Sequence, residues 1–333
     1  MLRSITELLE YSFFLLLSGI AQRVPFRTAS RLGARLGGAV FRLTPLRKRI
    51  TLDNLAHAFP AKSTEERYHI AHEAYRNYGT AVVQMAWSWG QSEQALMNTV
   101  NPGNMDVAAK AGARGKGVIL LSAHYGGWEL LLSGLRLHLG SPLTAVVQRQ
   151  RNRRIDDLIE RHRSRFGNTM VPMGPAVREV MMTLRRGGNV LMLGDQSGPK
   201  ESEFVEFFQR PAATHRGTAA FSLKTGASIV TVLLVRQADE TYTAVFEEVD
   251  RTGLDTYQGD AIAELTRRHA KVLEKHIRLN PDHWLWMHKR WKHTAYFQSL
   301  QGERSALAAG ETTHGGSHAG ERPEAQDPAK GRA

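Results

Sequence analysis

The sequence predicts an α/β fold: a central, mostly parallel β-sheet flanked by helices, preceded by an N-terminal helical segment that associates with a membrane. Three observations predict it. From residue 117 onward, short apolar segments alternate with amphipathic segments of helical length. The chain has 333 residues and is 42% hydrophobic, enough for one large core. It carries 44 Lys and Arg against 32 Asp and Glu, and the excess is concentrated near the N-terminus.

Residues 1–44 are expected to form the membrane-associating segment. Residues 1–50 hold nine basic and two acidic residues, and the most apolar run, residues 11–21, lies among them. That run is shorter than the roughly 20 apolar residues that span a bilayer, and no small-x-small cleavage site follows it. After it, basic residues recur every four positions and apolar residues occupy another helical face: Arg27, Arg31 and Arg35, with Leu32, Leu36 and Val40. The pattern favours a helix lying on an anionic membrane, with an ordinary amphipathic surface helix as the alternative.

Residues 45–298 are expected to form the α/β domain. Apolar residues at helical spacing predict helices over residues 45–100, and Asn101-Pro-Gly predicts a turn. Strands are then expected at 117–123, 143–148, 169–172, 189–194, 228–236 and 242–249, the last two as an antiparallel pair. Helices are expected at 128–139, 154–166, 175–186, 218–225 and 261–279.

Residues 299–333 are rich in Gly, Ala, Pro and charge and show no apolar period, so they are expected to be disordered. His314 and His318 in this tail are more simply a chance pair than metal ligands. The chain has no Cys, which excludes disulfides, zinc–thiolate sites and a Cys nucleophile.

The stretch 117–132 (GVILLSAHYGGWELLL) carries the main chemical signal. His124 stands where an apolar strand ends, and Glu129 follows in H-x-x-x-x-E spacing in the first turn of the next helix. A His there can act as a general base while the carboxylate hydrogen-bonds its far ring nitrogen. Gly126 and Gly127 leave backbone N–H groups and a helix N-terminus open to developing negative charge. The alternative is a structural His at a strand end.

Two other strands end in polar residues. Arg149 follows the strand at 143–148, and Asp195 follows the strand at 189–194. Active sites of open α/β sheets gather at the carboxyl ends of the strands, so these residues are expected near His124. Arg149 could instead be a solvated surface cation, and Asp195 could cap its turn.

Laid out in order, several blocks resemble one known family over roughly residues 5–297. They are RITLDNLAHAFP at 49–60, the HYGGWE block, VVQRQRNRRID at 146–156 with Arg149 and Asp156, GDQ at 194–196, FVEFFQRPAATHRGTAAFSLKTGASIV at 204–230 and HWLWMHKRWK at 283–292. With these blocks the chain resembles the lipid A biosynthesis (late) acyltransferases, of the lauroyl/myristoyl type. The resemblance implies a glycerolipid/lysophospholipid acyltransferase-like fold, within the lysophospholipid acyltransferase-like superfamily.

The resemblance also implies a reaction. An acyl carrier protein, which is acidic, would donate a fatty acyl chain to a hydroxyl of a lipid A precursor at the cytoplasmic face of a bacterial inner membrane. His124 would be the base and Glu129 its partner acid. Arg149 would bind phosphate or carbonyl oxygen, and Asp195 and Gln196 would lie near the acceptor. Neither a cofactor nor a metal is implied, and anionic membrane lipids are the expected surface partner.

Three positions depart from the family's usual residues: Gly127 replaces Asn, Ser197 replaces an acidic residue or His, and Gln209 replaces Gly. They leave the chemistry in place but leave the acceptor and the acyl chain open. The same chemistry on a different glycolipid or phospholipid is therefore one alternative. A metal-dependent hydrolase is a more remote one, because no H-E-x-x-H motif is present. A nucleic-acid binder would need a recognition motif that the sequence lacks.

Overall fold

The computed structural model describes residues 2–254 and 256–303. The chain divides into two compact units, Met1–His293 and Thr294–Ala333. In the second unit, residues 294–303 form a helix. Most of the tail that the sequence predicts to be disordered, including His314 and His318, lies outside the described residues.

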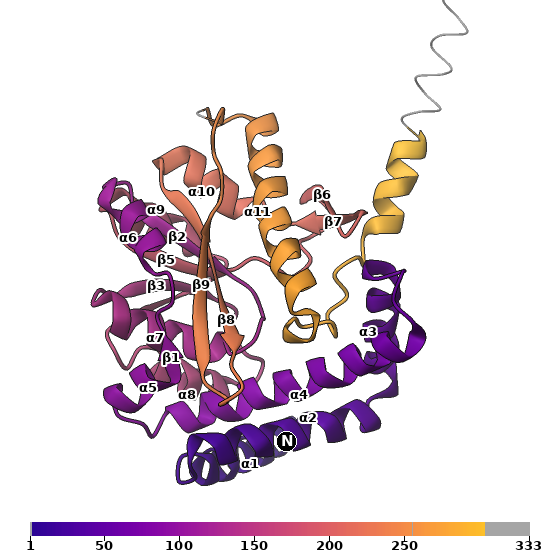
Figure 1. Cartoon of the computed structure of the whole chain (residues 1–333). Helices are drawn as coiled ribbons and strands as arrows, with labels where there is room; N and C mark the ends of the chain where they lie inside the picture. The colour runs from indigo at the N-terminus through magenta and orange to yellow at the C-terminus, as the bar shows by residue number, and fades with distance from the viewer. Residues whose placement is uncertain (1, 255, 304–333) are drawn as a thin grey trace, which may run out of the picture. The chain divides into compact units, whose positions relative to one another are not determined.

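Seven strands of the described residues form a mostly parallel sheet in the order β1-β9-β8-β2-β5-β3-β4 (Figure 1). Strands β8, β2, β5, β3 and β4 are parallel, whereas β9 runs antiparallel to β8, with β1 parallel to β9. This confirms the predicted mostly parallel sheet and its late antiparallel pair. Their bounds are β1 Val100–Asn101, β2 Val118–Ser122, β3 Leu143–Val147, β4 Thr169–Pro172, β5 Asn189–Leu193, β8 Ser228–Arg236 and β9 Tyr242–Glu248.

Helices cover both faces of this sheet. The central strand β2 is buried throughout: Val118 and Leu120 pack against α6 (Asp106–Ala113) and α7 (Trp128–Leu139), and Ile119 and Leu121 against the opposite helices. These are α9 (Ala176–Arg185), α10 (Gly217–Thr225) and α11 (Gly259–Leu279). Because strand side chains alternate between faces, a strand buried on both sides needs a continuous apolar run, as VILLS provides. The remaining elements of the domain are α5 Glu93–Thr99, α8 Arg153–Arg163 and the short 3-10 helix η1 Pro281–His283.

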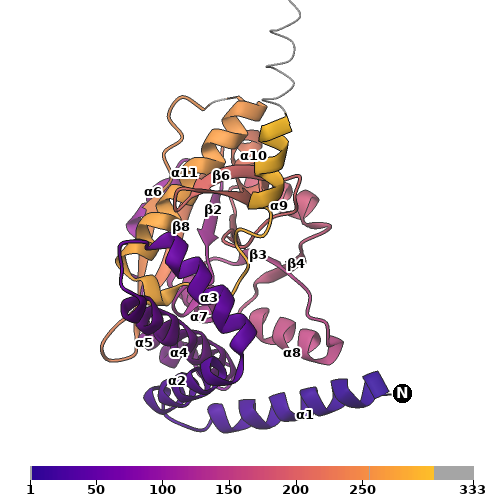
Figure 2. The same ribbon diagram turned by 90° about the vertical axis from the view of Figure 1, so that its right-hand side faces the viewer.

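The N-terminal helices gather at one end of the sheet (Figures 1 and 2). They are α1 Leu2–Ala21, α2 Phe26–Leu43, α3 Pro45–Ala58 and α4 Thr64–Ser88. Helix α4 begins at a capping box, in which the Ser63 hydroxyl accepts from the amide of Glu66 and the Glu66 carboxylate accepts from the amide of Ser63. Tyr78 of α4 stacks on Trp128 at the start of α7, with ring centroids 5.5 Å apart. This contact places α4 beside the carboxyl end of β2.

Helices α2 and α4 cross closely because glycine lines their contact. A Cβ added at Gly37 would lie 2.1 Å from the carbonyl oxygen of Tyr75, and one at Gly33 would lie 2.6 Å from that of Gly79. The basic residues of α2 point outward instead, as the sequence pattern indicates: Arg27, Arg31 and Arg35 are exposed.

One hairpin is absent from the sequence prediction. Strands β6 (Glu203–Phe207) and β7 (Arg210–Thr214) pair antiparallel through a two-residue turn, Phe208-Gln209. Both turn residues have positive φ, 52° and 60°. Hairpin turns of this kind usually contain Asn or Gly, so Phe-Gln gives no turn signal. Among the described residues, no helix is both long and apolar enough to cross a membrane.

We predict that Gly37→Ala lowers the free energy of unfolding by about 1–3 kcal/mol, because its methyl group would overlap the backbone of α4. Gly38→Ala is the matched control on the same turn. Its methyl group would meet only side-chain atoms, at 3.5 Å or more, so it should be neutral or stabilise by up to about 1 kcal/mol. Urea unfolding followed by circular dichroism measures both, and equal stability of the two variants would contradict the close helix crossing.

Candidate active site

His124 leaves the sheet two residues after the end of β2 and is held by the backbone on both sides. Its carbonyl oxygen accepts from the amide of Leu285, and the amide of Gly126 donates to the carbonyl of His283. Tyr125 and Trp284 thereby form an antiparallel bridge. The segment after η1 thus fixes the loop that carries His124.

The imidazole of His124 contacts Asp195, which follows β5. Nδ1 of His124 lies 2.9 Å from Oδ1 of Asp195, and the backbone amide of His124 donates to Oδ2 at 3.1 Å. Oδ2 also accepts from the indole Nε1 of Trp284 at 3.0 Å. Strands β2 and β5 are adjacent and parallel, so their carboxyl ends bring these residues together from 71 positions apart.

The electrostatics of the pair follow from burial and charge. Burial lowers the pKa of His124, but the charge and hydrogen bond of Asp195 outweigh it, so the pKa is raised above its ordinary value. Burial raises the pKa of Asp195, yet His124 and the hydrogen bonds bring it below its usual range. An ionised Asp195 can only accept, so Nδ1 of His124 carries the proton and Nε2 has a free lone pair. The His124 side chain is 21% exposed and Asp195 only 2%, so the ring alone reaches solvent.

The hydrogen-bond partner of Glu129 differs from the predicted one. Instead of holding the ring of His124, its two carboxylate oxygens accept from Nη2 of Arg163 in α8, at 2.9 and 3.0 Å. Glu129 still acts on His124 through its charge, which raises the pKa of the imidazole, while Arg163 lowers it. The expected hydrogen bond between a ring nitrogen of His124 and a carboxylate therefore exists, but the carboxylate that accepts it belongs to Asp195. In the sequence, Arg163 belongs to a basic run at 161–165 that indicates a solvated face or a binding surface for an acidic carrier protein or substrate phosphates, and nothing in it predicts the pairing with Glu129.

The two glycines of the turn have different surroundings. Gly126 has φ +53°, a Cβ there would lie 1.9 Å from the carbonyl oxygen of Leu234, and its N–H is already bonded to His283. Gly126 therefore shapes the loop, and its amide is not available to a substrate oxygen. Gly127 is the N-cap of α7, and a Cβ there would lie 2.7 Å from the ring of Tyr242. Any larger side chain at this position, Asn included, would collide with Tyr242.

Arg149 and Gln196 lie at the carboxyl ends of β3 and β5, as predicted. The Arg149 side chain is 59% exposed, and its Nη1 lies 3.7 Å from Oδ2 of Asp156. Gln196 directly follows Asp195 and is half-buried. The structure thus brings Asp195 against His124 and leaves Arg149 exposed beside Asp156.

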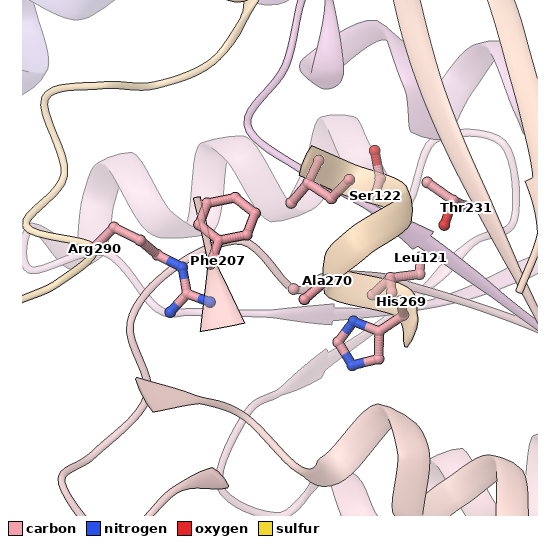
Figure 3. Close-up of a pocket in the computed structure, with 9 residues that line it drawn as sticks. Leu121, Ser122, Phe207, Thr231, His269, Ala270 and Arg290 are labelled. Atoms are coloured by element: carbon pink, nitrogen blue, oxygen red, sulfur yellow. The ribbon is translucent and has the colours of Figure 1, made fainter. Parts of the chain in front are cut away.

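Figure 3 shows a small cavity whose lining includes Ser122, the last residue of β2, and Gly194, which directly precedes Asp195. Its volume is about 10 Å³, the size that one water molecule needs, so it is no acyl-chain pocket. Arg290, His269 and Thr231 are among its lining residues, and Arg290 donates to the carbonyl of Ala213 and the hydroxyl of Thr214. Burial lowers the pKa of Arg290 to about 10 and that of His269 to about 3. A wider hollow, of about 560 Å³, lies on the N-terminal helices, lined by Phe41, Arg42, Thr64, Glu65, Tyr68, His69 and His72. Across the described ranges, no three His, Asp or Glu side chains cluster as metal ligands do.

Comparison with known proteins adds to this geometry. Residues 3–293 match the family model described as bacterial lipid A biosynthesis acyltransferase. The lipid A biosynthesis palmitoleoyltransferase of Escherichia coli (strain K12) is 30% identical over 274 residues, covering 81% of this chain and 87% of the relative. The lipid A biosynthesis lauroyltransferase of the same strain is 27% identical, with the same coverage. The lipid A biosynthesis acyltransferase of Haemophilus influenzae is 26% identical and covers 83% of this chain and 84% of itself.

Asp195→Asn should lower the pKa of His124, because the amide removes the charge that opposes the effect of burial. The pKa can be measured by NMR titration of the imidazole resonances. Asp282→Asn is the matched control: Asp282 contacts the ring of His283 at 3.1 Å in the same way, without touching His124. A His124 pKa that is the same in wild type and Asp195→Asn would contradict the assigned contact.

Proposed function

Since the chain belongs to the bacterial lipid A biosynthesis acyltransferase family and is an acyltransferase, we propose that it transfers a fatty acyl chain from acyl carrier protein to a hydroxyl of a lipid A precursor. The observation that carries the mechanism is the His124–Asp195 contact. A buried carboxylate contacts Nδ1 of a partly exposed imidazole, so that Nε2 can accept a proton, which is the arrangement of a general base.

In the proposed reaction, Nε2 of His124 takes the proton from the acceptor hydroxyl as its oxygen attacks the thioester carbonyl. The C–O bond forms, and the carbonyl oxygen becomes the tetrahedral oxyanion. When this collapses, the C–S bond breaks and the imidazolium returns its proton to the leaving thiolate. Asp195 stabilises the imidazolium that exists between the two transfers. This series of steps requires no covalent acyl-enzyme intermediate.

The oxyanion needs donors that are not already used. Because the Gly126 amide is bonded to His283, we assign this role to the N-terminus of α7, at Gly127 and Trp128. The first amides of a helix have no intrahelical acceptor, and the helix dipole favours negative charge there. Arg163, paired with Glu129 at the same helix end, adds a cation on this side of His124.

The acidic carrier protein is proposed to dock on the basic side of α8 and the loop before it. Six arginines in this region are exposed: Arg149, Arg151, Arg153, Arg154, Arg161 and Arg165. Opposite charges across an interface steer association and set specificity. Arg149 is therefore proposed to bind the carrier or a substrate phosphate, and Gln196 to lie near the acceptor.

The membrane is proposed to contact α1 and α2. Large apolar side chains are exposed along both helices: Ile5, Leu8, Leu9, Phe13, Leu15, Leu16 and Ile20 in α1, and Leu36, Val40 and Leu43 in α2. Exposed arginines of α2 lie beside them, as expected of a helix in an anionic interface. Because α4 joins these helices to the site through Tyr78 and Trp128, a lipid acceptor would be presented close to His124. We propose the cytoplasmic face of the bacterial inner membrane as the location.

His124→Ala should reduce acyl transfer by about 10²–10⁴-fold while the protein stays folded. Full-length enzyme would be assayed with acyl carrier protein bearing a labelled acyl chain and an under-acylated, phosphorylated lipid A precursor, with and without chelator. Unchanged transfer by the folded variant would exclude His124 as the base. Transfer by wild type only to another glycolipid or a phospholipid would keep the chemistry and change the acceptor, and loss with chelator would favour a metal-dependent enzyme.

Arg151, Arg153 and Arg154 changed together to Glu should raise the KM for acyl carrier protein by about tenfold or more, with a smaller effect at high salt. Arg178 and Arg185 on α9 and Arg186 directly after it are also exposed, and their joint change to Glu alters the net charge equally. If both triple variants raise KM alike, only the overall charge matters and α8 is not the docking surface.

A further inference from the structure

Trp284 touches both halves of the proposed catalytic pair. Its backbone bridges to Tyr125, next to His124, and its indole reaches Asp195. We infer that Trp284 is a positioning residue: its indole N–H fixes the carboxylate of Asp195 in the orientation that holds His124 ready to accept a proton. This inference rests on the proposed function, because it gives the pair its catalytic role.

Backbone hydrogen bonds fix the position of Trp284 relative to the loop that carries His124. The carbonyl of His283 accepts from the amide of Gly126 at 2.9 Å, and the amide of Leu285 donates to the carbonyl of His124 at 3.1 Å. These two bonds flank Trp284 and pair it with the loop that carries His124. The backbone of Trp284 is therefore fixed next to that of His124, although 160 positions separate the two residues in the chain.

Packing then fixes the indole plane. Trp284 is only 1% exposed and meets Trp286 and Phe207 edge to face, at centroid distances of 4.6 and 5.6 Å. An aromatic ring held on several sides has one rotamer available. Its N–H is then aimed at Oδ2 of Asp195, at 3.0 Å.

Asp195 depends on this donor because its own burial is complete. Oδ1 serves the ring of His124, and Oδ2 accepts from the His124 amide and from Trp284. A buried carboxylate that loses one of its donors keeps an unsatisfied oxygen and gains freedom to rotate. Rotation would break the contact with Nδ1 that leaves Nε2 unprotonated.

The pKa of His124 reports the effect of replacing Trp284, because the other charged groups around His124 and Asp195 stay in place. Asp195 acts electrostatically on His124, His288 and Arg290, and His124 also senses Glu129 and Arg163. None of these is altered by replacing Trp284. Without the indole N–H, the freed carboxylate of Asp195 stabilises the imidazolium less, so the pKa of His124 falls toward the value that burial favours.

Trp291 provides a matched control in the same aromatic cluster. It is buried, its centroid lies 6.5 Å from that of Trp284, and its indole Nε1 also donates a hydrogen bond. The acceptor of that bond is the backbone carbonyl of Phe207, at 3.2 Å, rather than the catalytic pair. Trp291→Phe therefore removes an equivalent buried N–H with no contact to Asp195.

The test compares Trp284→Phe and Trp291→Phe in the full-length enzyme, by acyl transfer over a range of pH and by thermal unfolding. Trp284→Phe should lower kcat roughly tenfold or more with KM nearly unchanged, and the acidic limb of the kcat/KM profile should move to lower pH. Trp291→Phe should leave that limb in place even if it lowers Tm by a similar amount.

Equal effects of the two variants on kcat, with an unmoved acidic limb, would overturn the positioning role and leave only packing. If Trp284→Phe does not fold, the indole N–H resonance of Trp284 in ¹⁵N-labelled wild type decides: it should titrate with His124 and shift upfield in Asp195→Asn. A resonance insensitive to both would equally overturn the inference. Retained activity in His124→Ala is a different result, because it would overturn the proposed base itself.

Discussion

The contact between the imidazole of His124 and the buried carboxylate of Asp195 is the interaction on which the rest of the site depends. It keeps Asp195 ionised in an environment that by itself favours the neutral acid, and it selects the tautomer of His124. Neither residue could hold this state alone, because an unpaired buried charge is costly. Two neighbouring parallel strands supply the contact, so its precision comes from the sheet register that pairs Ser122 with Leu193.

The C-terminal segment of the first unit completes this arrangement. It pairs with the His124 loop through backbone hydrogen bonds, offers the Trp284 indole to Asp195, and accepts the Ser197 amide on Nε2 of His288 at 3.0 Å. Burial lowers the pKa of His288 to about 4, so it remains neutral and able to accept. Asn54 of α3 donates to the carbonyls of Trp286 and His288, which connects the N-terminal helices to the same segment. The site is thus assembled from strands, an N-terminal helix and a late segment that lie far apart in the chain.

The N-terminal helices combine two requirements in one sequence. The glycines of α2 allow close packing on α4, while its arginines and larger apolar side chains remain exposed. A helix bearing large residues on its inner face would sit further from α4. The stacking of Tyr78 on Trp128 then links this helical layer to the first turn of α7. The exposed arginines and apolar side chains of α2 are therefore connected to the site through α4.

The sequence by itself determined the mostly parallel sheet, the positions of its main strands along the chain and the loop that carries His124, because these depend on local apolar periodicity and turn chemistry. It also predicted that Asp195 lies near His124, because the apolar run of a strand shows where the strand ends. The partner of His124 was not readable: Glu129 and Asp195 are both acids at plausible positions, and only the adjacency of β2 and β5 places Asp195 against the ring. The partners of three further groups also depend on contacts between residues distant in the chain: Arg163, Trp284 and the Gly126 amide. Local patterns encode elements, whereas the partner of a side chain is fixed by which elements the tertiary structure brings together.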